Sequence, residues 1–201
     1  MCRVTNLTDA LAEFDRQLRR LTPLAFSHKI PGLSRDEIGM RFDEAGLRVP
    51  DDLVQWFSWQ NGSDAERPRL SVGPGYWCMD LDSLAGMYAE RTNFIAANLP
   101  QEVEYEIGWF PIMETTSGGT IVADCRGPQD HPVQCTLLSP ERLMKNRLLY
   151  TLSLTETLEL WATAMMDGTW EAVDGDPWPD WTSNRPDDSL PLQVSLTGLA
   201  L

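Results

Sequence analysis

The sequence is poor in basic residues and in histidine. Sixteen Lys and Arg stand against thirty Asp and Glu, two histidines are present, and the formal net charge is −14. Such a field repels nucleic-acid phosphates and anionic membrane surfaces, and it attracts a basic partner. We therefore expect neither direct nucleic-acid binding nor membrane binding. Solubility alone would also account for the charge.

The sequence also lacks long apolar runs and regular cysteine spacing. No stretch is apolar enough to cross a bilayer. The first residues, MCRVTNLTDALAEF, do not form the basic start and apolar run of a secretory signal, because Asp9 and Glu13 interrupt them. We therefore expect a cytoplasmic protein with reduced thiols, which are irregularly spaced at Cys2, Cys78, Cys125 and Cys135.

Groups that could hold a metal are few. Cys125, His131 and Cys135 offer three zinc ligands, and Cys78 a fourth, but the short Cys-x-x-Cys knuckle of a zinc motif is absent. The two cysteines at 125 and 135 also fit buried strand positions, where they act as small apolar side chains. We expect no metal and no cofactor.

Catalytic motifs are equally scarce. A Cys–His nucleophile pair has only His28 and His131 as possible bases, and neither lies in a recognisable motif. The glycine turn 117–119 lacks the lysine and the following helix that a phosphate loop needs, so it predicts a hairpin. We therefore expect a protein that is not an enzyme.

Apolar periodicity and helix caps predict the elements. Helices are expected over 7–21, from Ser34, from Pro50 to Asn61-Gly62, over 82–98 and from Ser153. Ser34 and Ser153 each precede a glutamate at capping-box spacing. Short strands are expected at 70–72, 76–79, 107–113, 120–125 and 133–137.

The order of these elements predicts the fold class. Glycine turns between the last three strands favour an antiparallel meander. Helices, then strands, then a closing helix predict a single α+β domain with a mostly antiparallel sheet covered by helices. We assign this domain to residues 1–170. Residues 171–201 form an acidic extension rich in Pro and Trp, either packed by its tryptophans or partly disordered.

Three local strings resemble the SUKH superfamily, the Smi/Knr type of domain. LRVPDDLVQWF at 47–57, followed by Asn61-Gly62, resembles its proline, helix, Asn-Gly block. WFPI at 109–112, followed by a glycine turn and a strand ending at Asp124, resembles its central block. SLTETLELW at 153–161, followed by Asp167-Gly168, resembles its closing helix. The resemblance covers residues 33–170; the N-terminal helix and the acidic extension depart from it.

The resemblance implies a function. Members of this superfamily are single α+β domains without a cofactor or shared catalytic residues. Bacterial members are often immunity proteins that bind and block a toxin domain, frequently a nuclease, and fungal members are adaptors in cell-wall signalling. A nuclease groove is basic, and a chain of charge −14 complements it. We expect a protein-binding module, most simply an immunity protein for a basic toxin domain; the alternative is an adaptor with an endogenous signalling or cell-wall-related partner.

The acidic and aromatic clusters supply candidate contact residues for this partner. Interfaces favour Trp and Tyr anchors inside polar rims. Tyr76-Trp77 and the extension offer such aromatic residues near carboxylates. The candidates are Asp64, Glu66, Tyr76, Trp77, Glu102, Glu104, Glu106, Asp174, Asp176, Trp178, Asp180 and Trp181. The sequence leaves the identity of the toxin and the oligomeric state open.

Overall fold

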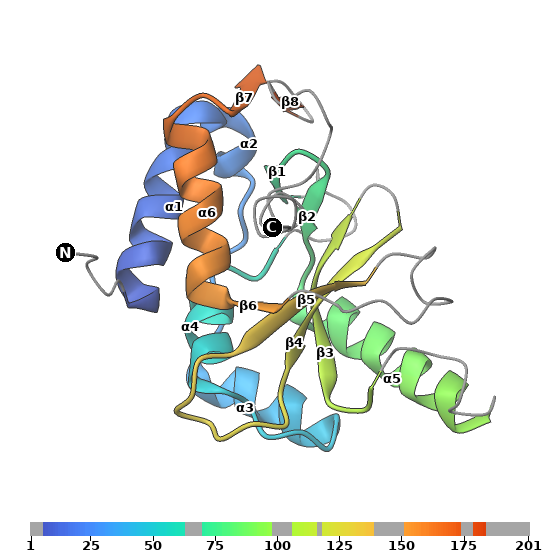
Figure 1. Ribbon diagram of the computed structural model, residues 1–201. Coiled ribbons are helices and arrows are strands. Elements are labelled where there is room, and N and C mark those ends of the chain that lie inside the picture. The colour runs from blue at the N-terminus through green and yellow to red at the C-terminus, as the bar shows by residue number, and fades with distance from the viewer. Residues whose placement is uncertain are drawn as a thin grey trace, which may run out of the picture.

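The computed structural model describes residues 6–62, 70–97, 106–115, 118–138, 151–173 and 179–183. Within these ranges, six helices pack around a curled, six-stranded antiparallel sheet, and a two-stranded hairpin forms a second, smaller sheet (Figure 1). The α+β class and the helix-covered antiparallel sheet predicted from the sequence are confirmed.

The main sheet is a meander in which every strand pairs with its neighbour along the chain. Its order is β1-β2-β3-β4-β5-β6, and each pair is antiparallel. A bulge between Pro111 and Met113 shifts the register of the central pair, which increases local twist and curl. The strands are β1 Leu70–Gly73, β2 Tyr76–Cys78, β3 Trp109–Thr115, β4 Thr120–Asp124, β5 Gln134–Leu138 and β6 Thr151–Ser153.

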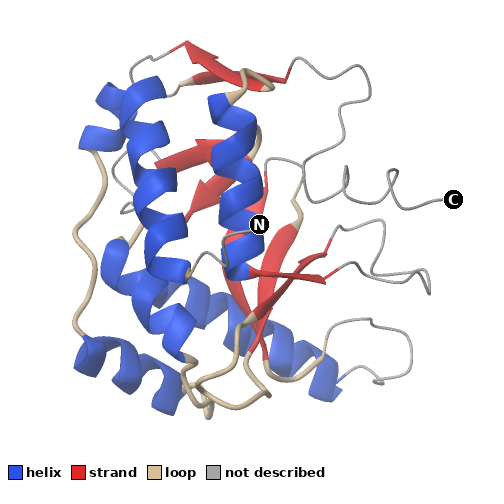
Figure 2. Cartoon of the chain, turned by 60° about the vertical axis from the view of Figure 1, so that its left-hand side comes forward, coloured by secondary structure: helices blue, strands red, loops and turns tan. Residues whose placement is uncertain are grey.

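The helices lie on two sides of this sheet. In Figure 1, α1, α2, α4 and α6 gather to its left, while α3 and α5 lie below it. In Figure 2 the molecule is turned so that the helices on the left of Figure 1 come toward the viewer. The bounds are α1 Leu7–Leu21, α2 Pro23–Ser27, α3 Arg35–Glu44, α4 Asp51–Trp59, α5 Leu81–Ala97 and α6 Leu154–Met166. None of these described helices is both long and apolar enough to span a membrane.

Helix caps occur where the sequence predicts them, with small shifts. Both capping boxes, at Ser34 and Ser153, are present. Pro50 is the N-cap of α4 and not its first helical residue. Pro23 begins α2, where the first turn of a helix needs no N–H at that position.

The Asn61-Gly62 pair follows α4 and packs against the start of α5. α4 already ends at Trp59. The Leu81 N–H at the start of α5 donates to Asn61 Oδ1 at 2.8 Å. Gly62 has φ +62 and lies against the Met79 carbonyl, where a side chain would clash. The pair therefore serves the junction between two helices and not the α4 cap that the sequence suggested.

Aromatic rings connect the left-hand helices to the sheet. Trp161 on α6 lies 4.7 Å from Tyr76 and 5.9 Å from both Phe14 and Trp170, measured between ring centroids. All four side chains are buried. Buried aromatic side chains contribute large apolar areas, so α1, α6 and β2 are held together at this cluster.

The hairpin begins inside the main domain. β7 Trp170–Val173 pairs with β8 Asp180–Ser183, and buried Trp170 lies against Gly73 of β1, where a Cβ would come within 2.7 Å of its ring. Trp181 packs edge-on to Trp170 at 6.4 Å. The predicted boundary at 170/171 thus cuts a strand, and residues 179–183 of the predicted extension pack onto the domain. Residues 174–178 and 184–201 lie outside the described ranges.

Candidate protein-binding surface

Most of the predicted contact residues fall outside the described ranges. Described among the candidates are Tyr76, Trp77, Glu106, Asp180 and Trp181. The others stay predictions from the sequence: Asp64, Glu66, Glu102, Glu104, Asp174, Asp176 and Trp178.

The aromatic candidates differ in how deeply their side chains are buried. Tyr76 is fully buried in the aromatic cluster, so its side chain cannot contact a partner in this conformation. Trp77 points the other way and is half-buried. Trp181 is half-buried against Trp170, so its ring already packs within the protein.

The acidic candidates differ in their local partners. Glu106 is exposed, but it forms an ion pair with Arg126, which also pairs with Asp124 at 2.6 Å. The same guanidinium lies 5.8 Å from the centroid of the Trp109 ring. Glu106 and Asp124 share the single positive charge of Arg126, which therefore offsets part of the Glu106 charge. Asp180 is the first residue of β8 and is exposed.

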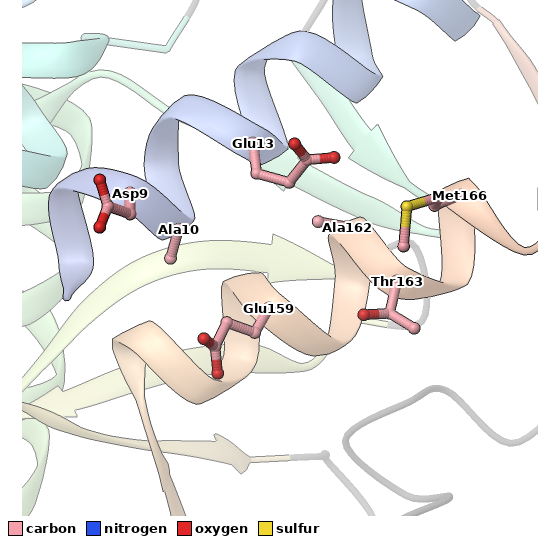
Figure 3. Close-up of a pocket in the computed structure, with 7 residues that line it drawn as sticks. All are labelled: Asp9, Ala10, Glu13, Glu159, Ala162, Thr163 and Met166. Atoms are coloured by element: carbon pink, nitrogen blue, oxygen red, sulfur yellow. The ribbon is translucent and has the colours of Figure 1, made fainter. Parts of the chain in front are cut away.

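A groove between α1 and α6 brings together residues that the sequence did not single out. The two helices lie side by side and run in the same direction (Figures 1 and 2). The groove has a volume of about 300 Å³. It is lined by Asp9, Ala10, Glu13, Glu159, Ala162, Thr163 and Met166 (Figure 3).

Helical spacing explains how these residues reach one groove. Asp9 and Glu13 are four residues apart on α1, and Glu159 and Thr163 are four apart on α6, so each pair lies on one helix face. Between the two faces, the buried side chains of Ala10 and Ala162 form the floor. Their small size leaves the hollow. Met166, which is 60% exposed, stands at one end.

The helix pair that forms the groove is held firmly. The buried rings of Phe14 and Trp161 meet below it at 5.9 Å. At the C-terminal ends, Arg20 Nη2 donates a hydrogen bond of 2.8 Å to the carbonyl oxygen of Met165. The groove is therefore a preformed feature of the fold, and its shape does not depend on surface side chains alone.

The carboxylates around the groove differ in how far they are neutralised. Glu13 accepts hydrogen bonds from Arg16 Nη2 at 2.6 Å and Gln17 Nε2 at 2.7 Å. These bonds, chiefly the one from Arg16, hold the pKa of Glu13 below its ordinary value, so it is ionised. Within the described part of the chain, Asp9 and Glu159 have no ion-pair partner, and both reach solvent.

A second groove, between α3 and α5, shows the opposite arrangement. Its volume is about 440 Å³, and its lining includes Ala45, Ala85, Gly86 and Ala89. Arg41 on its rim forms an ion pair with Asp82, and another with Glu44 at 3.4 Å. Glu44, the one carboxylate among the described lining residues of this groove, is thus already paired with a cation of the same chain.

The cysteines and histidines do not assemble into a reactive site in the described ranges. Burial raises the pKa of the Cys125 thiol to about 12, and it also raises the pKa values of Cys78 and Cys135. A thiol needs to be deprotonated to act as a nucleophile or a metal ligand. His131 is exposed in the loop after β4. Across the described residues, no group of three His, Cys, Asp or Glu side chains is placed to hold a metal.

No family model matches the chain, and no curated protein matches it. The SUKH resemblance accordingly rests on the three sequence blocks alone. The groove had no sequence signal of its own, because helical periodicity predicts which residues share a face and not which two helices lie together.

Proposed function

We propose that this chain is a SUKH-type protein-binding module that neutralises a basic toxin domain, most simply a nuclease, by covering its active groove. The observation that carries the proposal is the α1/α6 groove. There, Asp9 and Glu159 flank a preformed hollow without a cationic partner in the described part of the chain. Part of the net negative charge of −14 thus lies beside a hollow that can receive a side chain.

The physical basis is electrostatic complementarity. A cleft that binds nucleic-acid phosphates carries Lys and Arg, and an acidic protein is steered toward such a cleft. Complementary charge raises the association rate more than it raises affinity, and salt screens it. The proposed complex should therefore form quickly, and its association rate should fall as salt rises.

The family assignment in this proposal is supported by how its blocks are used. Pro50 is the N-cap of α4, and Asn61, just beyond the end of that helix, accepts a hydrogen bond from the first N–H of α5. The closing block begins at the Ser153 capping box and carries Trp161 into the aromatic cluster. Several residues of these blocks thus hold the fold, and Glu159 of the closing block lines the α1/α6 groove.

Affinity capture followed by a toxicity assay tests the proposal. The full chain, immobilised, is exposed to lysate of its source cell, and bound proteins are eluted with rising salt. We expect a basic protein to elute, and co-expression of this chain to suppress the toxicity of that protein. A salt-sensitive partner that is not toxic would favour the adaptor function instead. If no basic partner is retained at low salt, the proposal is wrong.

A further inference from the structure

We infer that the α1/α6 groove receives a lysine or arginine side chain from the partner protein. This inference rests on the proposed function, and it specifies which surface makes the contact. The occupant is one cationic side chain because the groove, at about 300 Å³, suits a single long side chain. An α-helix, about 10 Å across with its side chains, would only rest on the rim.

The floor of the groove matches the stem of such a side chain. Lys and Arg carry an apolar stem that packs along apolar surface while the charged head stays near water. Ala10 and Ala162 provide that surface, and the exposed thioether of Met166 lies beside it (Figure 3). Methionine adapts its shape to different partners. The stem is therefore covered on the floor and at one end.

The charges around the groove set the position of the cationic head. Arg16 pairs with Glu13 further along α1, and Arg20 binds the Met165 carbonyl near the helix C-termini. These cations repel a further cation at that end. Asp9 lies in the first turn of α1 and Glu159 in the middle of α6, on opposite sides of the floor and away from the Met166 end (Figure 3). Charge complementarity thus places the head at the Asp9 and Glu159 end.

The α3/α5 groove does not compete for this occupant. It is the larger of the two described here, and alanines also form part of its lining. However, Arg41 already pairs with Asp82 and Glu44 at its rim. A partner cation would have to displace that guanidinium, so the favourable interaction it could gain is already made within the chain.

An NMR titration of the full chain tests this inference without the natural partner. The probe is the blocked peptide acetyl-Gly-Arg-Gly-amide, and its matched control is the same peptide with neutral citrulline in place of arginine. We expect the arginine peptide to shift the backbone amide signals of Asp9, Ala10, Ala162 and Thr163 with saturating dependence on concentration. The citrulline peptide should bind about tenfold more weakly, as expected for loss of a close charge pair.

Two variants with equal net charge localise the effect. Asp9→Asn with Glu159→Gln should weaken binding of the arginine peptide about tenfold. Asp43→Asn with Glu90→Gln removes two exposed carboxylates elsewhere, which also have no ion-pair partner in the described part of the chain. This control should change the affinity by less than about twofold, because distant surface charges are screened.

The outcomes separate this inference from the proposed function. Amide shifts that are absent, do not saturate, or lie away from α1 and α6 would overturn the groove inference. Equal weakening by both variants would overturn it as well. Capture of a toxic basic partner that binds all these variants alike would leave the proposed function standing and the groove inference refuted. Failure of capture and protection would refute the proposed function, whatever the peptide does.

Discussion

The two grooves of this protein are built alike and charged differently. Each lies between two helices, and each has alanine side chains and at least one carboxylate in its lining. Between α3 and α5, Arg41 pairs with Glu44 of the lining and with Asp82 of α5. Between α1 and α6, Asp9 and Glu159 keep their charge open to solvent. Only the second arrangement leaves an interaction for a partner to complete.

This difference shows that net charge alone does not mark a binding surface. Glu106 illustrates the same point, because it belongs to an acidic run in the sequence and yet pairs with Arg126 in the fold. An exposed ion pair contributes little to stability, but it removes a carboxylate from the set available to a partner. The placement of a few arginines therefore decides which acidic residues remain usable.

The largest expected effect concerns the anchoring of the α1/α6 pair. Trp161→Ala removes a fully buried ring that touches Phe14, Tyr76 and Trp170. We expect it to lower the free energy of unfolding by about 3–5 kcal/mol, measured by urea denaturation. Trp77→Ala, at a half-buried position, should cost clearly less. Equal losses would show that the aromatic cluster does not anchor these helices.

Two glycine-to-alanine substitutions compare a tightly packed position with an open one. Gly73→Ala places a Cβ 2.7 Å from the Trp170 ring, and overpacking of this kind costs about 1–3 kcal/mol. Gly86→Ala, in α5 beside the second groove, meets no atom within 4 Å and should stabilise the helix by about 0.5–1 kcal/mol. Thermal denaturation of both variants gives the comparison. A neutral Gly73→Ala would mean that the hairpin does not pack against β1.

The capping box of α6 predicts a pH effect. The Ser153 hydroxyl donates to the Glu156 carboxylate at 2.7 Å, and the Ser153 backbone N–H does so at 2.8 Å. These bonds, the hydroxyl's first, lower the pKa of Glu156 below its ordinary value of 4.5. The stabilisation is therefore complete well above pH 4.5 and is lost as the pH falls through the lower, folded-state pKa.

Substitutions at this box test the sign of that effect. Ser153→Ala should cost about 1 kcal/mol at neutral pH, with a smaller difference from wild type in acid. Glu156→Gln should flatten the pH dependence of the melting temperature, because the glutamine does not titrate. Melting curves from neutral pH to below the folded-state pKa measure both. A Ser153→Ala penalty that grows in acid would contradict the assignment.

The smallest expected effect on stability comes from a substitution that makes the α3/α5 groove resemble the α1/α6 groove. Arg41→Gln removes the cation that pairs with Asp82 and Glu44. Because these pairs are exposed, we expect almost no change in melting temperature. The amide signals of Ala85 and Ala89 should now shift on addition of the arginine peptide, which leaves them unmoved in the wild type. If they stay unmoved in the variant, open carboxylates beside an apolar floor are not sufficient for binding.

Local sequence signals predicted most of the fold. The stripe of α1, the two serine caps and the glycine turns each act over a few residues, and the structure places these elements within about two residues of the predictions. The antiparallel meander followed from short turns between adjacent strands. Signals of this range do not need knowledge of the tertiary structure.

The missed features depend on contacts between distant segments. β6 has three residues, too few for a period, and is defined by its pairing with β5. The hairpin of β7 and β8 lies in a stretch rich in Asp and Pro, and its placement follows from Trp170 meeting Gly73. The groove needs Ala10 and Ala162 from opposite ends of the chain. Neither residue has a distinctive sequence context.

The most direct measurement of the central claim is a capture experiment on three columns. They carry the wild-type chain, Asp9→Asn with Glu159→Gln, and Asp43→Asn with Glu90→Gln, and they receive the same lysate. The account predicts that one basic, toxic protein is retained by the wild type and by the Asp43/Glu90 variant, is released by salt, and is lost from the Asp9/Glu159 variant. Equal retention on all three columns, or none on the wild type, would contradict it.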